Sequence, residues 1–300
     1  MNDVIRIGTR DSKLALWQAK LTKTKLEKSN IPVEIIPIKS DGDLNQITPL
    51  YEFGVTGIFT KNLDRALLNN EIDIAVHSLK DVPIDPAKGL KIGCVFKRAN
   101  PLDVLVLKNK NIDFSKKLTI ATSSIRRKCQ WLYKYPNHTI EVLRGNVDTR
   151  LEKLRKSNWD GAIFAKAGLE RLELKTKNTL LLNWMIPSAA QGAIALTTRE
   201  KEEDLKNILQ KINCNETMHC VTQERIFLKL MGGGCSMPIS AYAYYDKKEL
   251  ILKTNVCSID KKQSLTDISK YRKNDIEAGL KSYNKILEKG AEKILKSNLR

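Results

Sequence analysis

Several patterns that would place this chain of 300 residues in a common class are missing from it. No apolar run reaches the roughly 20 residues of a membrane-spanning helix, and the start, MNDVIRIG, has no signal-peptide core. The six cysteines, at positions 94, 129, 214, 220, 235 and 257, include no CxxC pair. This pattern favours a reducing cytosol over a disulfide framework. We therefore expect a cytoplasmic protein that makes no contact with a membrane.

The motifs that recognise nucleic acids are also absent, although the net charge of +18 first suggests a nucleic-acid partner. No zinc-finger spacing, RNP-like aromatic motif or basic region with heptads is visible. Much of the excess charge is lysine dispersed along expected helices at 201–211 and 281–296, which favours solvated helix faces. We expect no nucleic-acid partner, while binding of a polyanion stays open. Neither GxGxxG nor GxxxxGK[ST] is present, so a phosphate ligand is disfavoured.

The chain does contain a regular alternation of short apolar strands and amphipathic helices. The first half predicts strands at 5–8, 33–38, 74–76, 91–95 and 104–107, a helix capped by Ser12 and a helix at about 59–69. The pattern restarts with strands at 119–121, 140–143 and 162–165 and with helices from Ser123 or Ser124 to Tyr133 and at 147–156. A strand at 192–197 is expected to return to the first domain.

The pattern of expected elements changes after about Asn215. A helix, a glycine cluster, β-rich segments at 241–245 and 250–256 and a terminal helix indicate a small α+β domain. We predict three domains: residues 1–98 with 192–212, residues 99–191, and residues 213–300.

The most telling stretch is DIAVHSLKDVP, residues 73–83. Its apolar run, IAV, is typical of a strand buried on both faces, and Pro83 prevents further ladder pairing. Ser78, Lys80 and Asp81 follow at the carboxyl end of this strand, where ligands of open α/β sheets bind. A lysine beside an aspartate can hold an anion and move a proton at one point. Taken alone, the stretch is explained equally well by a solvated turn with a surface ion pair.

Arginines recur where the expected strands end. They are Arg10 after the first strand, Arg126 and Arg127 in the helix after 119–121, Arg144 at the end of 140–143, and Arg150 one turn further on. The planar guanidinium suits carboxylates or phosphates, and helix N-termini add backbone N–H donors. A surface ion pair explains each arginine singly, but few acidic residues lie near them in the sequence. Jointly they predict a cleft for a ligand with many negative groups.

A glycine cluster ends in a cysteine, at Gly232 to Cys235. Three glycines permit unusual backbone angles and close approach to a ligand. A thiolate on such a loop can be a nucleophile or a covalent attachment point, and a small buried cysteine in a turn is the alternative. A metal site is not indicated, because the adjacent His219 and Cys220 have no partner pair at ligand spacing.

Seven motifs occur in one order over nearly the whole chain: IGTRDSKLALWQA, DIAVHSLKDVP, ATSSIRRKCQ, LRGNVDTRLEKL, AKAGLERL, AAQGA and GGGCSMPI. In this combination the chain resembles the porphobilinogen deaminase (hydroxymethylbilane synthase) family. The resemblance implies two doubly wound α/β domains like the lobes of periplasmic binding proteins, plus a small α+β C-terminal domain. It also implies a monomeric transferase of porphyrin and heme biosynthesis, which joins four porphobilinogen molecules head to tail, releases ammonia and frees hydroxymethylbilane.

The resemblance further implies roles for single residues. Asp81 matches the catalytic aspartate, which protonates the departing amine and stabilises a cationic azafulvene through the pyrrole N–H. Cys235 would carry a dipyrromethane cofactor through a thioether. The positions that match cofactor-binding residues are Ser78, Lys80, Thr122, Ser124, Arg126, Arg127 and Arg150. Those that match positions beside the substrate or the growing chain are Arg10, Ser12, Gln18 and Arg144, and Gln191 matches a further family position.

Four positions depart from the family pattern. Thr56 stands where the lid segment usually carries a lysine, and Ile47 replaces an aspartate in the same loop. Gly232 replaces the acidic residue before GGC, and Ala190 replaces a glycine before Gln191. Because none of these changes affects Asp81 or Cys235, we expect the chemistry to survive, with a less cationic lid that closes more weakly over the growing chain.

Two other functions compete with this interpretation. One is a two-lobed anion receptor without catalysis, and the other is a polyanion binder suggested by the charge. A receptor does not need a covalent cofactor on Cys235, and a periplasmic receptor would need an export signal.

Overall fold

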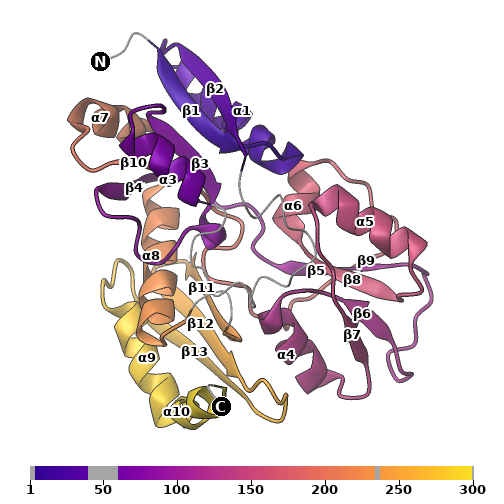
Figure 1. Ribbon diagram of the computed structural model, residues 1–300. Helices are drawn as coiled ribbons and strands as arrows, with labels where there is room; N and C mark the ends of the chain where they lie inside the picture. Colours follow the sequence, from indigo (N-terminus) through magenta and orange to yellow (C-terminus); the bar gives the residue numbers. More distant parts are fainter. Residues whose placement is uncertain (1–3, 40–59, 234–236, 299–300) are drawn as a thin grey trace. The chain divides into compact units, whose positions relative to one another are not determined.

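The computed structural model describes residues 4–39, 60–233 and 237–298, which form three β-sheets and their covering helices (Figure 1). The described residues divide into two compact units. The first unit comprises 4–39, 60–99 and 192–218, and the second comprises 100–191 and 219–298 apart from 234–236. No helix in the described part of the chain combines the length and the hydropathy of a membrane span.

The first unit contains a mixed five-stranded sheet in the order β2-β1-β3-β10-β4. Its strands are β1 (Ile5–Arg10), β2 (Val33–Ile38), β3 (Ile74–Ser78), β4 (Leu90–Val95) and β10 (Ile194–Arg199). The strands β1, β2 and β3 are parallel, whereas β10 runs antiparallel between β3 and β4. The prediction that a late strand returns to the first sheet is therefore confirmed.

Helices cover both faces of this sheet. They are α1 (Lys13–Glu27), α3 (Lys61–Leu68) and α7 (Glu203–Ile212). On one face Ile74 and Val76 of β3 share a core with α1 and α7, while on the other face Ala75 packs with α3. Apolar residues on both faces of β3 explain its unbroken IAV run, because a strand covered on both sides has no solvated face.

The second unit contains a mixed five-stranded sheet in the order β7-β6-β8-β5-β9. Its strands are β5 (Asp103–Leu107), β6 (Thr119–Ala121), β7 (Thr139–Glu141), β8 (Gly161–Ala165) and β9 (Thr179–Leu181). Its helices are α4 (Ile125–Lys134), α5 (Val147–Lys156) and α6 (Lys166–Arg171). The helices α5 and α6 share a core with one face of the sheet, and α4 packs on the other face (Figure 1).

The second unit also contains a three-stranded antiparallel sheet in the order β11-β12-β13. The elements are β11 (Ile239–Asp246), β12 (Glu249–Cys257), β13 (Ser264–Arg272), α9 (Ala278–Glu288), α10 (Ala291–Asn298) and, from residue 219 on, α8 (Asn215–Leu230). Helix α4 contacts this sheet directly: Cys129 packs against Cys257, and the Gln130 amide donates to Ser240 Oγ over 2.9 Å. Two mixed α/β sheets followed by an α+β layer confirm the predicted fold class.

Some predicted elements differ from the structure. Strand β7 ends at Glu141, so Arg144 lies in the following loop rather than at the strand end. The terminal helix is interrupted by Gly290, whose φ of 95° is left-handed, so that α9 and α10 are separate helices. The strands β9 and β13 were not predicted. The three-domain division stays a prediction, since the second unit contains two of the sheets.

Candidate functional site

The carboxyl edge of the first sheet gathers the predicted residues of the first unit. Because β1 and β3 are adjacent and parallel, their last residues, Arg10 and Ser78, lie at the same edge. A single 3-10 turn, Leu79–Asp81, follows Ser78 directly and carries Lys80 and Asp81. The fold thus places the polar end of DIAVHSLKDVP beside the end of the first strand.

Helix α1 contributes two more predicted residues to this edge. Ser12 is its N-cap, and the Ser12 hydroxyl accepts a hydrogen bond from the Ala15 amide over 3.3 Å. One turn into the helix, the Gln18 side chain is 2 % exposed and donates its Nε2 to Ser78 Oγ over 2.8 Å. The structure therefore joins Gln18, predicted beside the substrate, with Ser78, predicted beside the cofactor.

Asp81 differs from its neighbours in having no protein partner for its carboxylate. Among the residues that the structure describes, it makes no hydrogen bond and no ion pair, and it is half-buried. A carboxylate in this situation can accept a hydrogen bond from a ligand N–H or exchange a proton with it. Asp81 therefore has the geometry of a general acid or base.

His77 is the buried neighbour of this group on β3. It is 5 % exposed, and its Nε2 has no hydrogen-bond partner in the described residues. Burial, helped by the positive charge of Arg10, lowers the pKa of His77 to about 4. The imidazole is consequently neutral at pH 7.

The carboxyl edge of the second sheet holds the residues that follow β6. Ser124 is the N-cap of α4 and accepts a hydrogen bond from the Arg127 amide over 3.4 Å, while the Ser124 amide donates to Thr122 Oγ1 over 3.2 Å. The Ser123 hydroxyl bridges to the segment after β7, because it donates to the Leu143 carbonyl and accepts from the Leu143 amide at 2.8 and 3.0 Å. The ends of β6 and β7 are thereby fixed together.

Arg126 and Arg127 are not exposed at this edge but buried, at 5 % and 6 % exposure. Both pair with Asp103, which is fully buried: Arg126 Nη2 lies 2.8 Å from Asp103 Oδ2, and Arg127 Nη2 lies 2.7 Å from Oδ1. Arg127 Nε donates to the same oxygen over 3.1 Å. The acidic partner of these arginines is distant in the sequence, 24 residues before Arg127, so that the scarcity of nearby acidic residues did not reveal it.

Asp103 is the functional candidate that sequence reasoning missed. It is the first residue of β5, which runs antiparallel to β8, so that Asp103 pairs with Ala165 at the end of β8. The start of β5 therefore lies at the same edge as the ends of β6 and β8. An aspartate directly before the apolar run VLVL was the available signal, but its meaning depends on the strand direction.

The charge state of Asp103 follows from these contacts. Burial by itself would raise the pKa of its carboxyl, but the charges of Arg126 and Arg127 outweigh burial and lower the pKa to about 2. Gln191, which is 1 % exposed, adds a hydrogen bond from its Nε2 to Asp103 Oδ1 over 2.8 Å. The same Nε2 lies 2.7 Å from the Pro101 carbonyl.

Arg144 and Arg150 flank the loop between β7 and α5. Arg144 is 6 % exposed, and burial lowers the pKa of its guanidinium. Arg150 donates its Nε to the Gly145 carbonyl over 2.6 Å, and Lys153 Nζ donates to the Arg144 carbonyl over 3.1 Å. Arg144 thus lies on the loop that Ser123 attaches to the end of β6, and Arg150 is bonded to this loop from helix α5.

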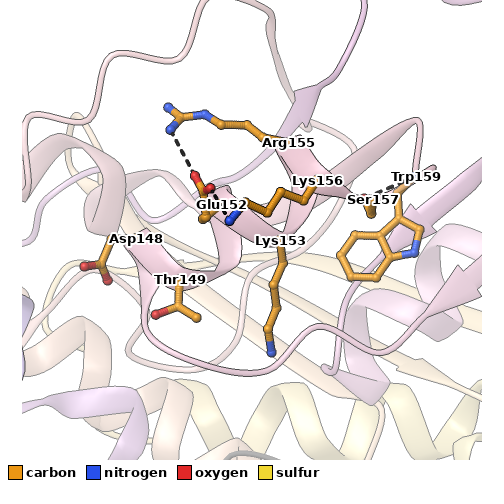
Figure 2. A pocket seen from close by; sticks show the side chains of 8 residues that line it. All are labelled: Asp148, Thr149, Glu152, Lys153, Arg155, Lys156, Ser157 and Trp159. Atoms are coloured by element: carbon orange, nitrogen blue, oxygen red, sulfur yellow. Dashed lines mark hydrogen bonds and ion pairs between the residues drawn. The ribbon is translucent and has the colours of Figure 1, made fainter.

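A shallow groove beside α5 lies apart from these residues. Figure 2 shows its eight lining side chains, in which Glu152 is paired with Arg155 and Lys156 at 3.6 and 3.1 Å. None of the predicted site residues lines the groove. Because exposed ion pairs of this kind are ordinary surface features, the groove does not indicate a ligand site. The described residues also contain no cluster of three His, Cys, Asp or Glu side chains that could hold a metal ion.

Comparisons with known proteins now decide the family. The model "Porphobilinogen deaminase, dipyromethane cofactor binding domain" matches residues 5–207, and the C-terminal domain model of the same family matches 218–288. The chain belongs to the porphobilinogen deaminase family. It is 45% identical to a probable porphobilinogen deaminase of Methanocaldococcus jannaschii over 83% of this chain and 86% of that protein. It is 40% identical to porphobilinogen deaminase of Francisella tularensis subsp. novicida over 87% and 89%.

A solved structure with a similar arrangement is the methionine-binding protein MetQ, with a TM-score of 0.46 and 14% identity over 74% of this chain and 95% of that chain.

Two of the departures from the family pattern fall on described residues. Ala190, at the position of the usual glycine, has a left-handed φ of 60°, and its amide donates to the buried Glu224 Oε2 over 2.6 Å. Gly232, at the position of the usual acidic residue, also has a left-handed φ, of 63°, with open space around its Cα. Thr56 and Ile47 lie outside the described residues, as does Cys235.

The described residues fit a dipyrromethane cofactor. Two guanidinium groups against one carboxylate leave one net positive charge buried at the N-terminus of α4. A helix N-terminus and a buried guanidinium both favour a carboxylate, which every pyrrole unit of such a cofactor carries. The donor set of the second sheet edge is therefore of the right chemistry for this group.

Proposed function

We propose that Asp81 is the catalytic acid and base with which this chain, as a hydroxymethylbilane synthase, joins four porphobilinogen molecules and releases ammonia. The observation that carries the proposal is the Asp81 carboxylate, which has no protein partner in the described residues although it lies beside Ser78 and Lys80 at a sheet edge. A carboxylate held in this way is available to the reacting pyrrole.

Asp81 moves the protons of each cycle. As a carboxylic acid it donates a proton to the amino group of porphobilinogen, which converts that group into a good leaving group, ammonia. As a carboxylate it accepts a hydrogen bond from the pyrrole N–H and stabilises positive charge there. It then helps to remove the proton from the carbon that has formed the new bond.

The residues that we assign to the cofactor include side chains of each unit and one cysteine. We assign the covalent thioether to Cys235 and the non-covalent contacts to the side chains at the ends of β3 and β6 and on α4 and α5: Ser78, Lys80, Thr122, Ser124, Arg126, Arg127 and Arg150. When bound, dipyrromethane supplies the pyrrole carbon to which the first substrate unit is joined. The serine and threonine hydroxyls supply hydrogen bonds, and the cations balance its carboxylates.

Four further residues bind the substrate and the growing chain. Arg10 and Arg144 neutralise carboxylates, while Ser12 and Gln18 orient them by hydrogen bonds. The bond from Gln18 to Ser78 supports this assignment, because it couples the substrate residues to the cofactor residues within one edge.

The assembly and location of the enzyme belong to the same proposal. We infer a monomer in the cytoplasm, with three domains at 1–98 plus 192–212, 99–191 and 213–300. The five described cysteines are free thiols, and four of them are buried, which supports a reducing compartment.

The test is incubation of the purified chain with porphobilinogen. The proposal predicts release of one ammonia for each porphobilinogen consumed and a linear tetrapyrrole identified by mass, with none from heat-denatured protein. Consumption of porphobilinogen without ammonia, or ammonia without a tetrapyrrole, would contradict it.

A further inference from the structure

The Asp103 carboxylate is the acceptor shared by the whole arginine site. Three side-chain donors converge on its Oδ1, namely Arg127 Nη2 and Nε and Gln191 Nε2, at 2.7 to 3.1 Å, and Arg126 Nη2 forms an ion pair with Oδ2 at 2.8 Å. A carboxylate has about four acceptor positions. Protein cations thus engage both oxygens of Asp103, although Oδ2 accepts no hydrogen bond from the described residues.

The guanidinium groups keep unused N–H donors. Each has five N–H donors. In the described structure Arg126 uses two, on Asp103 and on the Ile186 carbonyl at 2.9 Å. Arg127 uses three, two on Asp103 and one on the Ile163 carbonyl at 3.0 Å. Both arginines thus keep N–H donors for a ligand, in planes that Asp103 and two backbone carbonyls fix.

The charge of the cluster is also set by Asp103. Without the carboxylate two cations would lie side by side in a buried site, where water screens them poorly. With it, the cluster carries one net positive charge, the complement of one carboxylate group. Burial lowers the pKa of Arg126 while Asp103 opposes that shift, which shows how closely the cation depends on its partner.

We propose that Asp103, supported by Gln191, is a positioning residue that aims the Arg126 and Arg127 guanidinium groups at one carboxylate of the pyrrole ligand and limits their joint charge to the charge of that group. The inference rests on the proposed function, because it assumes that the two arginines hold the cofactor. It adds a role for a residue that touches neither cofactor nor substrate.

A matched control separates positioning from general stability. Asp267 is likewise a buried aspartate of the second unit, 6 % exposed, and is paired with Lys289 Nζ and Ser269 Oγ at 2.6 Å each. Asp267→Asn therefore removes a comparable buried charge from the third sheet, where no site residue lies. Asp103→Asn and Asp103→Glu change the charge and the reach of the carboxylate in the arginine cluster.

Each purified variant is incubated with porphobilinogen at a temperature set a fixed number of degrees below its own unfolding midpoint. Intact mass then gives the fraction of the protein that carries dipyrromethane. We expect at least a tenfold lower rate of loading for Asp103→Asn than for Asp267→Asn, and partial recovery in Asp103→Glu. Equal loading of Asp103→Asn and Asp267→Asn would overturn the inference and leave Asp103 a stability residue only.

A milder variant keeps the test decisive if Asp103→Asn does not fold. Gln191→Met removes one bond to Asp103 without a change of charge, and we expect about threefold slower loading with the protein still folded. Loading at the wild-type rate would contradict the proposal. The proposed function itself would be overturned if the wild type took up no dipyrromethane and released no ammonia. Only this inference would be overturned if the wild type were loaded and active and the Asp103 and Gln191 variants were loaded at the normal rate.

Discussion

Two aspartates at two sheet edges show how differently one residue type can be used. Asp81 follows a parallel strand of the first sheet, is half-buried and has no hydrogen bond or ion pair within the described residues. Asp103 begins an antiparallel strand of the second sheet, is fully buried, forms ion pairs with two arginines and accepts hydrogen bonds from Arg127 and Gln191. The carboxylate that we propose to react has no protein partner, whereas the carboxylate that we propose to position other groups is paired with two buried cations.

The largest expected effect is the loss of activity when Asp81 is changed. Asp81→Asn removes the proton donor but keeps the shape, so kcat should fall by about 10²–10⁴ while the unfolding midpoint stays within the error of the wild type. The matched control is Asp85→Asn, an exposed aspartate on the same loop that should keep wild-type kcat. Steady-state ammonia release together with thermal unfolding checks both parts. A folded, loaded Asp81→Asn enzyme with wild-type kcat would refute the assignment.

A large loss of stability is expected when Asp103, at the second sheet edge, is changed. Asp103→Asn leaves two buried cations without their shared anion, and breaking a buried pair in this way typically costs about 3–5 kcal/mol of unfolding free energy. Denaturant unfolding of Asp103→Asn beside Asp81→Asn measures the contrast. If both variants lost the same stability, the distinction between a paired and a partnerless carboxylate would be wrong.

As the pH is lowered, His77 at the first sheet edge and Asp103 at the second should affect stability over different pH ranges. The pKa of His77 is lowered by burial, and by Arg10, from 6.5 to about 4. Between these values the unfolded chain binds a proton that the folded chain does not, so stability falls as the pH falls from about 6.5 to about 4, by about 3 kcal/mol. His77→Gln should flatten this part of the stability curve, and an unchanged slope would contradict the neutral state of His77.

The contribution of Asp103 should be lost at a lower pH. Its pKa is about 2 in the folded chain and near 3.8 when unfolded, so its stabilisation is complete above about pH 4 and disappears as the pH falls through about 2. The difference between wild type and Asp103→Asn should accordingly be constant from pH 5 to 8. A difference that already shrinks across that range would show that Asp103 titrates there.

The smallest expected effects come from the two serine caps. Ser12→Ala and Ser124→Ala each remove one long cap bond, of 3.3 and 3.4 Å, and should each cost about 0.5–1 kcal/mol of stability. Their functional effects should differ: Ser12→Ala should raise KM for porphobilinogen, and Ser124→Ala should slow loading of the cofactor. Kinetics and intact mass distinguish these outcomes. Identical phenotypes would contradict the assignment of Ser12 to the substrate and Ser124 to the cofactor.

Local sequence signals predicted the elements that carry the site, but not the contacts between distant elements. Ser12 and Ser124 are recognisable as caps because the capping bond joins residues three apart, and β3 is recognisable by its buried run. The pairing of Asp103 with Arg126 and Arg127 depends on β5 running antiparallel to β8, and no local pattern encodes that direction.

Strand β13 was missed for a related reason. Its inward positions include Asp267 and Ser269, which break the expected alternation of apolar and polar residues. Both receive protein partners from α9 and the turn after it, because Lys289 binds Asp267 and Lys285 Nζ donates to Ser269 Oγ over 3.0 Å. Polar residues that are satisfied inside a layer look like solvated residues in the sequence.

The central claim, that this chain builds its product on a pyrrole primer attached to Cys235, is tested most directly by intact mass. We would compare the wild type with Cys235→Ser, before and after incubation with porphobilinogen. The account predicts a wild-type mass in excess of the polypeptide by two condensed pyrrole units, and no such excess in Cys235→Ser. A wild type that stays unmodified after incubation, or a Cys235→Ser variant that carries the same excess, would contradict it.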